Sequence, residues 1–158
     1  MSFKQRQINS LFSLGTQTLS LEGLRCQALI MNPGGSAAAA QLQLRVYGMT
    51  LAQMNQYSSA GQVLANVQSV LIVVSAGNVG ETMAQVFAGS LMRSYIDFSA
   101  SPEVSFVCAA TCGLHEKAQA VAANSYKDSQ NAEDIIKALA AKIGFQFVNK
   151  NGAHAVVQ

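Results

Sequence analysis

Apolar and polar residues alternate with a period of two along most of residues 1–112, and this pattern limits that region to β-strands. In the clearest segment, Leu42, Leu44 and Val46 alternate with Gln41, Gln43, Arg45 and Tyr47. Because successive side chains of a strand point to opposite faces, we expect the aliphatic row to face a core. A second inward row comprises Val104, Phe106, Cys108 and Ala110.

Two further segments predict long strands. One face of residues 91–98 would carry Met92, Ser94, Ile96 and Phe98, and the other face Leu91, Arg93, Tyr95 and Asp97. Earlier in the chain, a single long strand is outlined by Leu19, Leu21, Leu24 and Leu29. Gly23 breaks the alternation of that strand at a position where a β-bulge would fit.

Turn signals separate the predicted strands, at residues 32–35, 76–80 and 101–103. The second of these is typical of a hairpin loop. Several short strands at this spacing predict an antiparallel barrel or sandwich. One short helix is expected near residues 51–58, because Thr50 and Gln53 have the spacing of a capping box. Leu51 and Met54 of this helix would face the barrel.

Beyond Cys112 the pattern changes to that of a small helix-plus-hairpin unit. Its helix has an apolar face formed by Ile135, Ile136, Leu139, Ala140 and Ile143. Ser129 or Asn131 is the expected N-cap, and Gly144 ends the helix. A strand at 145–148, a turn at 151–152 and a returning strand at 153–157 would complete the unit. Because the unit buries little surface by itself, we expect it to be the start of a further domain of a longer protein.

The expected fold class is therefore α+β and mainly β. Residues 1–112 would form an antiparallel β-barrel domain with one short helix, and residues 113–158 a small partial α/β unit.

Charged residues make up only 11% of the chain, against roughly 25% in typical soluble domains. Ten Lys and Arg oppose eight Asp and Glu, so the net charge is only +2. This balance argues against a nucleic-acid partner, because phosphate binding needs a basic stripe. A surface covered by partner subunits would explain the low charge, and so would a merely alanine-rich composition. With few Lys and Glu to protect strand edges, we expect a homo-oligomer joined through those edges or through the hairpin before Gly89.

The sequence predicts no membrane anchor. Its most apolar run, residues 70–74, is far shorter than the roughly 20 residues that a membrane-spanning helix needs. The first seven residues do not lead into an apolar signal-peptide core, so we expect synthesis and retention in a cytoplasm-like compartment.

Residues that could carry catalysis or bind metal occur without a supporting pattern. Cys108, Cys112 and His115 have the spacing of a partial zinc site, with Cys26 and His154 as the remaining candidate ligands. Cys108 lies in an inward row, where a free cysteine behaves as a small hydrophobe. A nucleophile pair of Cys112 and His115 would lack a third group to orient the base. We therefore expect the three cysteines to be reduced and free of metal.

Carboxylates and glycines also have structural explanations. Glu133 and Asp134 suit the first turn of a helix, whereas Asp97 and Glu103 flank a turn without an evident partner. The glycines at 34–35 and 77–80 are expected in turns, because a phosphate-binding loop would be followed by Lys and then Ser or Thr. The sequence thus assigns no catalytic residue, no cofactor-binding residue, no cofactor and no metal ligand.

Several segments, in this order, resemble the baseplate (tail) hub proteins of tailed bacteriophages and prophages. The most specific match is residues 44–50 (LRVYGMT) followed by 54–56 (MNQ). The other matching segments are 3–8, 12–15, 21–30, 32–35, 70–77, 86–89, 95–98, 100–106, 124–127, 135–139 and 144–145.

The resemblance implies a first domain shaped like the barrel of the tail tube. It also implies homotrimers that close the tube near its tip and contact the tail-tube protein and the tail-tip or spike proteins. The expected location is the virion tail, after assembly in the bacterial host cytoplasm, and the expected role is structural and not enzymatic. Two alternatives stay open: a tail-tube-type subunit of a phage or secretion-like apparatus, and a small-ligand-binding or catalytic β-barrel.

Overall fold

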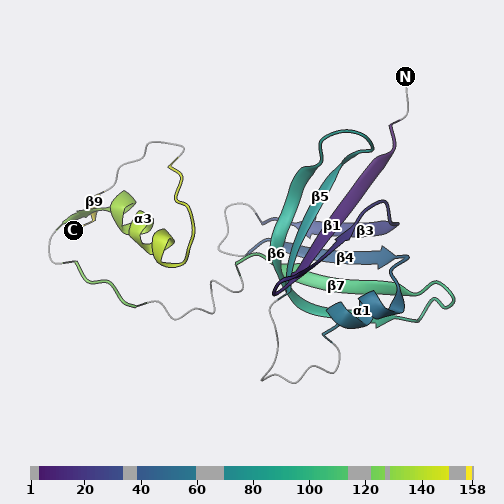
Figure 1. Ribbon diagram of the computed structural model, residues 1–158. Coiled ribbons are helices and arrows are strands. Elements are labelled where there is room, and N and C mark those ends of the chain that lie inside the picture. Colours follow the sequence, from purple (N-terminus) through teal and green to yellow (C-terminus); the bar gives the residue numbers. More distant parts are fainter. Residues whose placement is uncertain are drawn as a thin grey trace. The chain divides into compact units, whose positions relative to one another are not determined.

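The computed structural model describes residues 4–33, 39–59, 70–113, 122–126, 129–149 and 156–157. The chain divides into two compact units, Met1–Leu114 and His115–Gln158. The first unit is built mainly of strands, and the second contains a helix and a short pair of strands (Figure 1).

Seven strands of the first unit form one antiparallel sheet. They are β1 (Arg6–Leu14), β2 (Gln17–Leu21), β3 (Cys26–Met31), β4 (Gln41–Tyr47), β5 (Val70–Asn78), β6 (Ala84–Asp97) and β7 (Ser105–Thr111). Their order across the sheet is β2-β1-β5-β6-β7-β4-β3, and every neighbouring pair is antiparallel. The mainly β, antiparallel fold predicted from the period-two pattern is confirmed.

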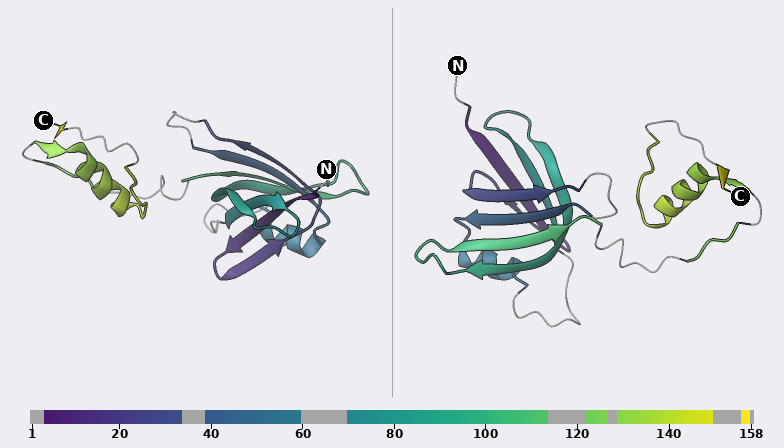
Figure 2. Two further views of the ribbon diagram at one scale, coloured as in Figure 1. Left: turned by 90° about the horizontal axis from the view of Figure 1, so that it is seen from above. Right: turned by 180° about the vertical axis from the view of Figure 1, so that it is seen from behind.

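The sheet is strongly curved. Phe12 on β1 and Phe106 on β7 are fully buried, and their ring centroids lie 5.9 Å apart. Because β5 and β6 separate these two strands, a flat sheet would place them about 14 Å apart. In Figures 1 and 2, β1 and β5 run steeply across β4 and β7. The sheet therefore wraps around its own core.

The closed form of the expected barrel is not observed in the described residues, because no ladder joins the two edge strands, β2 and β3. Six antiparallel steps across the sheet make these two edges run in the same direction, so closing the barrel would need a parallel pair. The start of β3 does approach β1, where the Cys26 thiol donates to the Ile8 carbonyl at 3.7 Å.

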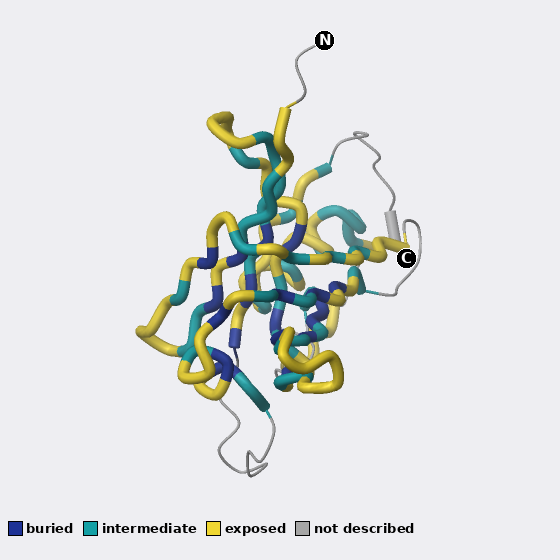
Figure 3. The backbone as a smooth tube through the Cα atoms, turned by 90° about the vertical axis from the view of Figure 1, so that its right-hand side faces the viewer, coloured by how far each residue is buried: buried dark blue, intermediate teal, exposed yellow. Residues whose placement is uncertain are grey.

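The core consists largely of the two inward rows expected from the sequence. Leu42, Leu44 and Val46 of β4 are buried, and so are Phe106, Cys108 and Ala110 of β7. Val104 packs against the same core and is partly buried. Figure 3 shows the buried positions alternating with more exposed ones along the strands.

The face predicted for residues 91–98 is wrong at both ends. Met92 is 59% exposed although Ser94 is buried, because the register of β6 with β7 shifts between Leu91 and Arg93. This irregularity places one extra residue in β6 and turns Met92 outward. Phe98 lies beyond the end of β6 and is exposed.

The single long strand expected at residues 19–29 is also wrong. The segment forms β2 and β3, which lie at opposite edges of the sheet. Gly23 has a φ of 68° and belongs to the connection between them rather than to a bulge. A positive φ of this kind favours glycine, so the residue that interrupts the alternation redirects the chain.

Helix α1 (Leu51–Tyr57) begins with the predicted capping box. The Thr50 hydroxyl accepts from the Gln53 N–H at 3.3 Å, and the Gln53 side chain accepts from the Thr50 N–H at 3.0 Å. Met54 and Tyr57 are buried, but Leu51 is 54% exposed and does not face the core. Burial is thus confined to the second half of this short helix.

The second unit contains α3 (Ala132–Lys142), β8 (Gln130–Asn131) and β9 (Val156–Val157). The Asn131 side chain caps the helix by accepting from the Glu133 N–H at 3.1 Å, and Gly144, with a φ of 77°, follows the C-cap, as predicted. The strand predicted at 145–148 is wrong, because β9 pairs with β8 before the helix. The predicted turn at 151–152 lies outside the described residues.

Candidate functional site

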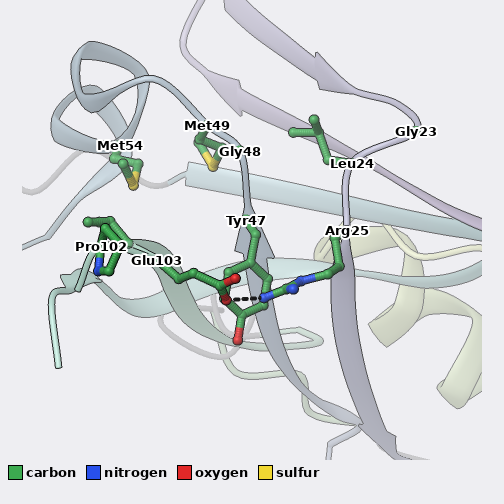
Figure 4. Close-up of a pocket in the computed structure, with 10 residues that line it drawn as sticks. Gly23, Leu24, Arg25, Tyr47, Gly48, Met49, Met54, Pro102 and Glu103 are labelled. Carbon is green, nitrogen blue, oxygen red and sulfur yellow. Dashed lines mark hydrogen bonds and ion pairs between the residues drawn. The ribbon is translucent and has the colours of Figure 1, made fainter. Parts of the chain in front are cut away.

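The first unit has an open groove of about 560 Å³ at one end of the sheet. Three connections supply its walls: the β2–β3 turn, the segment between β4 and α1, and the β6–β7 turn. Its lining residues include Leu24, Arg25, Tyr47, Met49, Met54 and Glu103 (Figure 4).

An ion pair crosses the groove. The Arg25 guanidinium lies 3.9 Å from the centroid of the Tyr47 ring and contacts a Glu103 carboxylate oxygen at 2.7 Å. The hydrogen bond to Glu103 raises the pKa of Arg25. Both charged side chains are 63% exposed, so the pair contributes little to stability but links two turns. The partner of Glu103, which was not evident from the sequence, is therefore Arg25.

The floor of the groove is apolar. Met49 and Met54 belong to the buried core, and Leu24 and Val104 pack against it. A hydrophobic floor beneath a charged rim can accept an apolar group of a ligand or partner. The Arg25 guanidinium is already paired with Glu103, and among the described lining residues there is no Ser, Cys or His.

A second ion pair lies on the sheet itself. Arg45 contacts Asp97 at 2.7 Å and donates to the Ser105 hydroxyl at 2.8 Å. Hydrogen bonds from Ser99, followed by the one from Arg45, lower the pKa of Asp97 to about 2. No partner of Asp97 was evident from the sequence, and the structure pairs it with Arg45, as it pairs Glu103 with Arg25.

The cysteines occupy separate places in the fold. Cys108 is buried as predicted, and burial raises the pKa of its thiol to about 12. Burial also raises the pKa of Cys26, whereas the Cys112 thiol donates to the Ala88 carbonyl at 2.9 Å. The two histidines, at positions 115 and 154, lie outside the described residues. Across the described ranges, no three His, Cys, Asp or Glu side chains gather as a metal site would require.

Gly80 lies in the turn that joins β5 to β6, as expected for a turn glycine, whereas Gly77 lies within β5, opposite Gln7 of β1. Lys4 forms an ion pair with Glu81 in this hairpin, and hydrogen bonds first from Lys4 and then from Asn78 lower the pKa of Glu81. The glycines at 34–35 lie outside the described residues. Glu133 and Asp134 occupy the first turn of α3, as predicted.

From the sequence we expected unprotected strand edges, but the sequence did not show which strands form the edges of the sheet. Both β2 and β3 lack Lys, Arg, Asp, Glu and Pro. Natural sheets usually protect an edge with such residues or with a bulge. The absence of charge over residues 26–31 was visible in the sequence, but only the strand order identifies that segment as an edge.

Comparison with protein-family models found no match, and neither did a comparison with curated protein sequences. In the described part of the chain, no helix is long and apolar enough to cross a membrane.

Proposed function

We propose that this chain is a structural component of a phage or prophage tail, the baseplate hub that joins the tail tube to the tail tip. The observation that carries the proposal is the curved sheet with two uncharged edge strands, β2 and β3. Neighbouring copies that cover such edges would make the usual protective charges unnecessary. The ordered resemblance of the chain to hub proteins supports the same role.

Two further observations are compatible with a structural role. The groove residues bind one another rather than forming a reactive centre, and the low overall charge suits a surface covered by partners. The proposed partners are further copies of the chain, as a trimer, together with the tail-tube and tail-tip proteins.

The test is to place an epitope tag on the chain in a tail-producing bacterium and to locate the tag by immunogold electron microscopy. A hub predicts label at one end of each tail and three copies per tail. Label along the whole tube, with six copies per ring, would replace the hub with the tail-tube alternative. Tails without label would refute both roles.

Small-ligand binding is a second candidate, favoured by the groove of about 560 Å³. It predicts a small molecule that is retained by the purified chain in native mass spectrometry. Arg25→Ala should release this molecule, whereas substitution of the exposed Arg93, which does not line the groove, should not. A purified chain with no bound molecule would count against this alternative.

A further inference from the structure

The backbone groups of β3 divide between a paired side and an open side. The Tyr47 N–H donates to the Arg25 carbonyl at 2.9 Å. Continuing the β3–β4 register by one residue beyond Cys26 and Val46 places these two residues opposite each other. Hydrogen-bonded pairs alternate along an antiparallel ladder. Gln27 and Leu29 therefore also bond to β4, whereas the N–H and C=O groups of Cys26, Ala28 and Ile30 point away from it. In the part of the chain that the structure describes, no strand pairs with this open side.

The open side is free of electrostatic obstacles to a second strand. Residues 26–31 are all uncharged. Arg25, which precedes β3, and Arg45, which lies opposite Gln27 on β4, are each paired with a carboxylate of the same chain at 2.7 Å. Arg6 of β1 lines a pocket with Cys26 at the first residue of β3, so among the described residues the positive charge near this edge is confined to that end. Leu29 is 53% exposed on the outer face. An incoming strand would therefore meet neutral, partly apolar side chains, and the most suitable match is another neutral edge.

We propose that two free copies of the chain pair through β3, in antiparallel orientation, about a two-fold axis at Ala28. This register places Ala28 opposite Ala28 of the second copy, and Cys26 opposite its Ile30. All three open residues then face open residues, and inner faces stay continuous with inner faces. On the outer face, Gln27 lies opposite Leu29 of the second copy.

The other edge strand, β2, cannot form such a joint with β3. Leu14 and Gln17 flank the two-residue β1–β2 turn, which makes them a hydrogen-bonded pair. The groups of β2 that point outward from the sheet edge therefore belong to Thr18 and Ser20, whose side chains are on the outer face. The open groups of β3 belong to inner-face residues, so an antiparallel β2–β3 joint would place an inner face against an outer one. Only a parallel, head-to-tail joint would remain for that combination.

The inference goes beyond the hub role and does not depend on it. An unassembled subunit has to keep its open edge from pairing indiscriminately. A two-fold symmetric interface buries that edge in a closed dimer, because the same edge of both copies is paired and no open edge of β3 remains. If the chain also assembles into a ring, as the proposed function holds, the dimer would compete with that assembly.

Disulfide trapping tests the register in the full chain. The Gln27→Cys variant and the Leu29→Cys variant are prepared separately and then mixed. In the proposed dimer, the cysteine of one variant would lie opposite that of the other as a non-hydrogen-bonded pair, about 4.5 Å apart at Cα, within reach of a disulfide. The expected result is several-fold more disulfide dimer in the mixture than in either variant alone. Gln43→Cys is the matched control, since it faces the same side one strand inward. The wild-type chain measures the background from the native cysteines.

The proposal is overturned if the mixture gives no more dimer than the Gln43→Cys control. It is also overturned if Leu29→Cys couples instead to Ser20→Cys, because that product would indicate a head-to-tail joint through β2. The distribution of gold label on tails tests the hub role separately. A trapped β3 dimer of a chain absent from tails would refute only the hub role.

A second variant keeps the test independent of disulfide chemistry. Ala28→Pro removes an N–H that points away from β4, and proline is tolerated at such edge positions. The folded variant should stay monomeric in analytical ultracentrifugation at concentrations where the wild-type chain dimerises. A wild-type far-ultraviolet circular dichroism spectrum confirms folding. A folded variant that dimerises as strongly as the wild type would overturn the proposal.

Discussion

The contact between Phe12 and Phe106 offers a direct test of the curvature of the sheet. The two rings meet at 5.9 Å and 77°, in an edge-to-face arrangement, although two strands separate β1 from β7. We consider Phe12→Leu, Phe106→Leu and the double variant. Each substitution removes a ring from the core but leaves a large aliphatic side chain, so the fold should survive.

The magnitude follows from the geometry. Truncating a buried Phe to Ala costs about 3–5 kcal/mol, and Leu should cost less because it leaves a smaller cavity. The ring–ring interaction adds about 0.5–1.5 kcal/mol beyond area burial. The double variant should therefore be more stable than the sum of the single losses predicts, by about 0.5–1.5 kcal/mol, because the ring pair can be lost only once.

The free energy of unfolding would be measured by urea denaturation with far-ultraviolet circular dichroism. Phe98→Leu is the matched control, because this exposed ring lies outside the core and should combine additively with Phe106→Leu. Residues without contact are additive to within about 0.3–0.5 kcal/mol. A coupling free energy of Phe12 with Phe106 inside that range would refute the curved arrangement of β1 over β7.

Four further outcomes are expected. The folded pKa of Asp97 is about 2 against an ordinary value of 3.8, so its stabilising contribution is complete above about pH 4 and is lost as the pH falls towards 2. Asp97→Asn should therefore make the thermal midpoint less dependent on pH over that range. Gly89→Ala should lower the free energy of unfolding by about 1–3 kcal/mol, because the added Cβ would lie 2.6 Å from the Thr111 carbonyl oxygen; a wild-type urea midpoint would contradict this. Thr50→Ala removes the capping hydroxyl of α1 and should cost about 0.5–2 kcal/mol in the same assay. In the folded chain, Cys108 should be the slowest thiol to react with a maleimide, and equal rates for all three cysteines would disagree with its burial.

Local features of this protein could be predicted from the sequence because neighbouring residues determine them. The alternation at Leu42, Leu44 and Val46 reports which face of a strand is buried. The capping box at Thr50 likewise depends only on residues within one helical turn. Such patterns established strands, a short helix and a mainly β fold without knowledge of any long-range contact.

Long-range arrangement could not be predicted in the same way. Arg45 and Asp97 are 52 residues apart in the chain, and Arg25 and Glu103 are 78 apart, so neither ion pair leaves a periodic signal. Each pair exists because the strand order brings its two segments together. The groove beside Arg25 has the same origin, since three separate connections form its walls.

The leucines at 19–29 show most clearly which features follow from the sequence and which depend on the tertiary structure. Their spacing indicated strand, and all but Leu24, which lies in the connection, belong to strands. Whether they make one strand or two, and whether those strands lie inside the sheet or at its edges, depends on which partner each finds. The sequence alone thus determined most of the strand-forming segments and the inward faces of β4 and β7. Only the tertiary structure decided the order β2-β1-β5-β6-β7-β4-β3, because backbone hydrogen bonds between strands are the same for every sequence and the choice among partners is made by packing of the whole core.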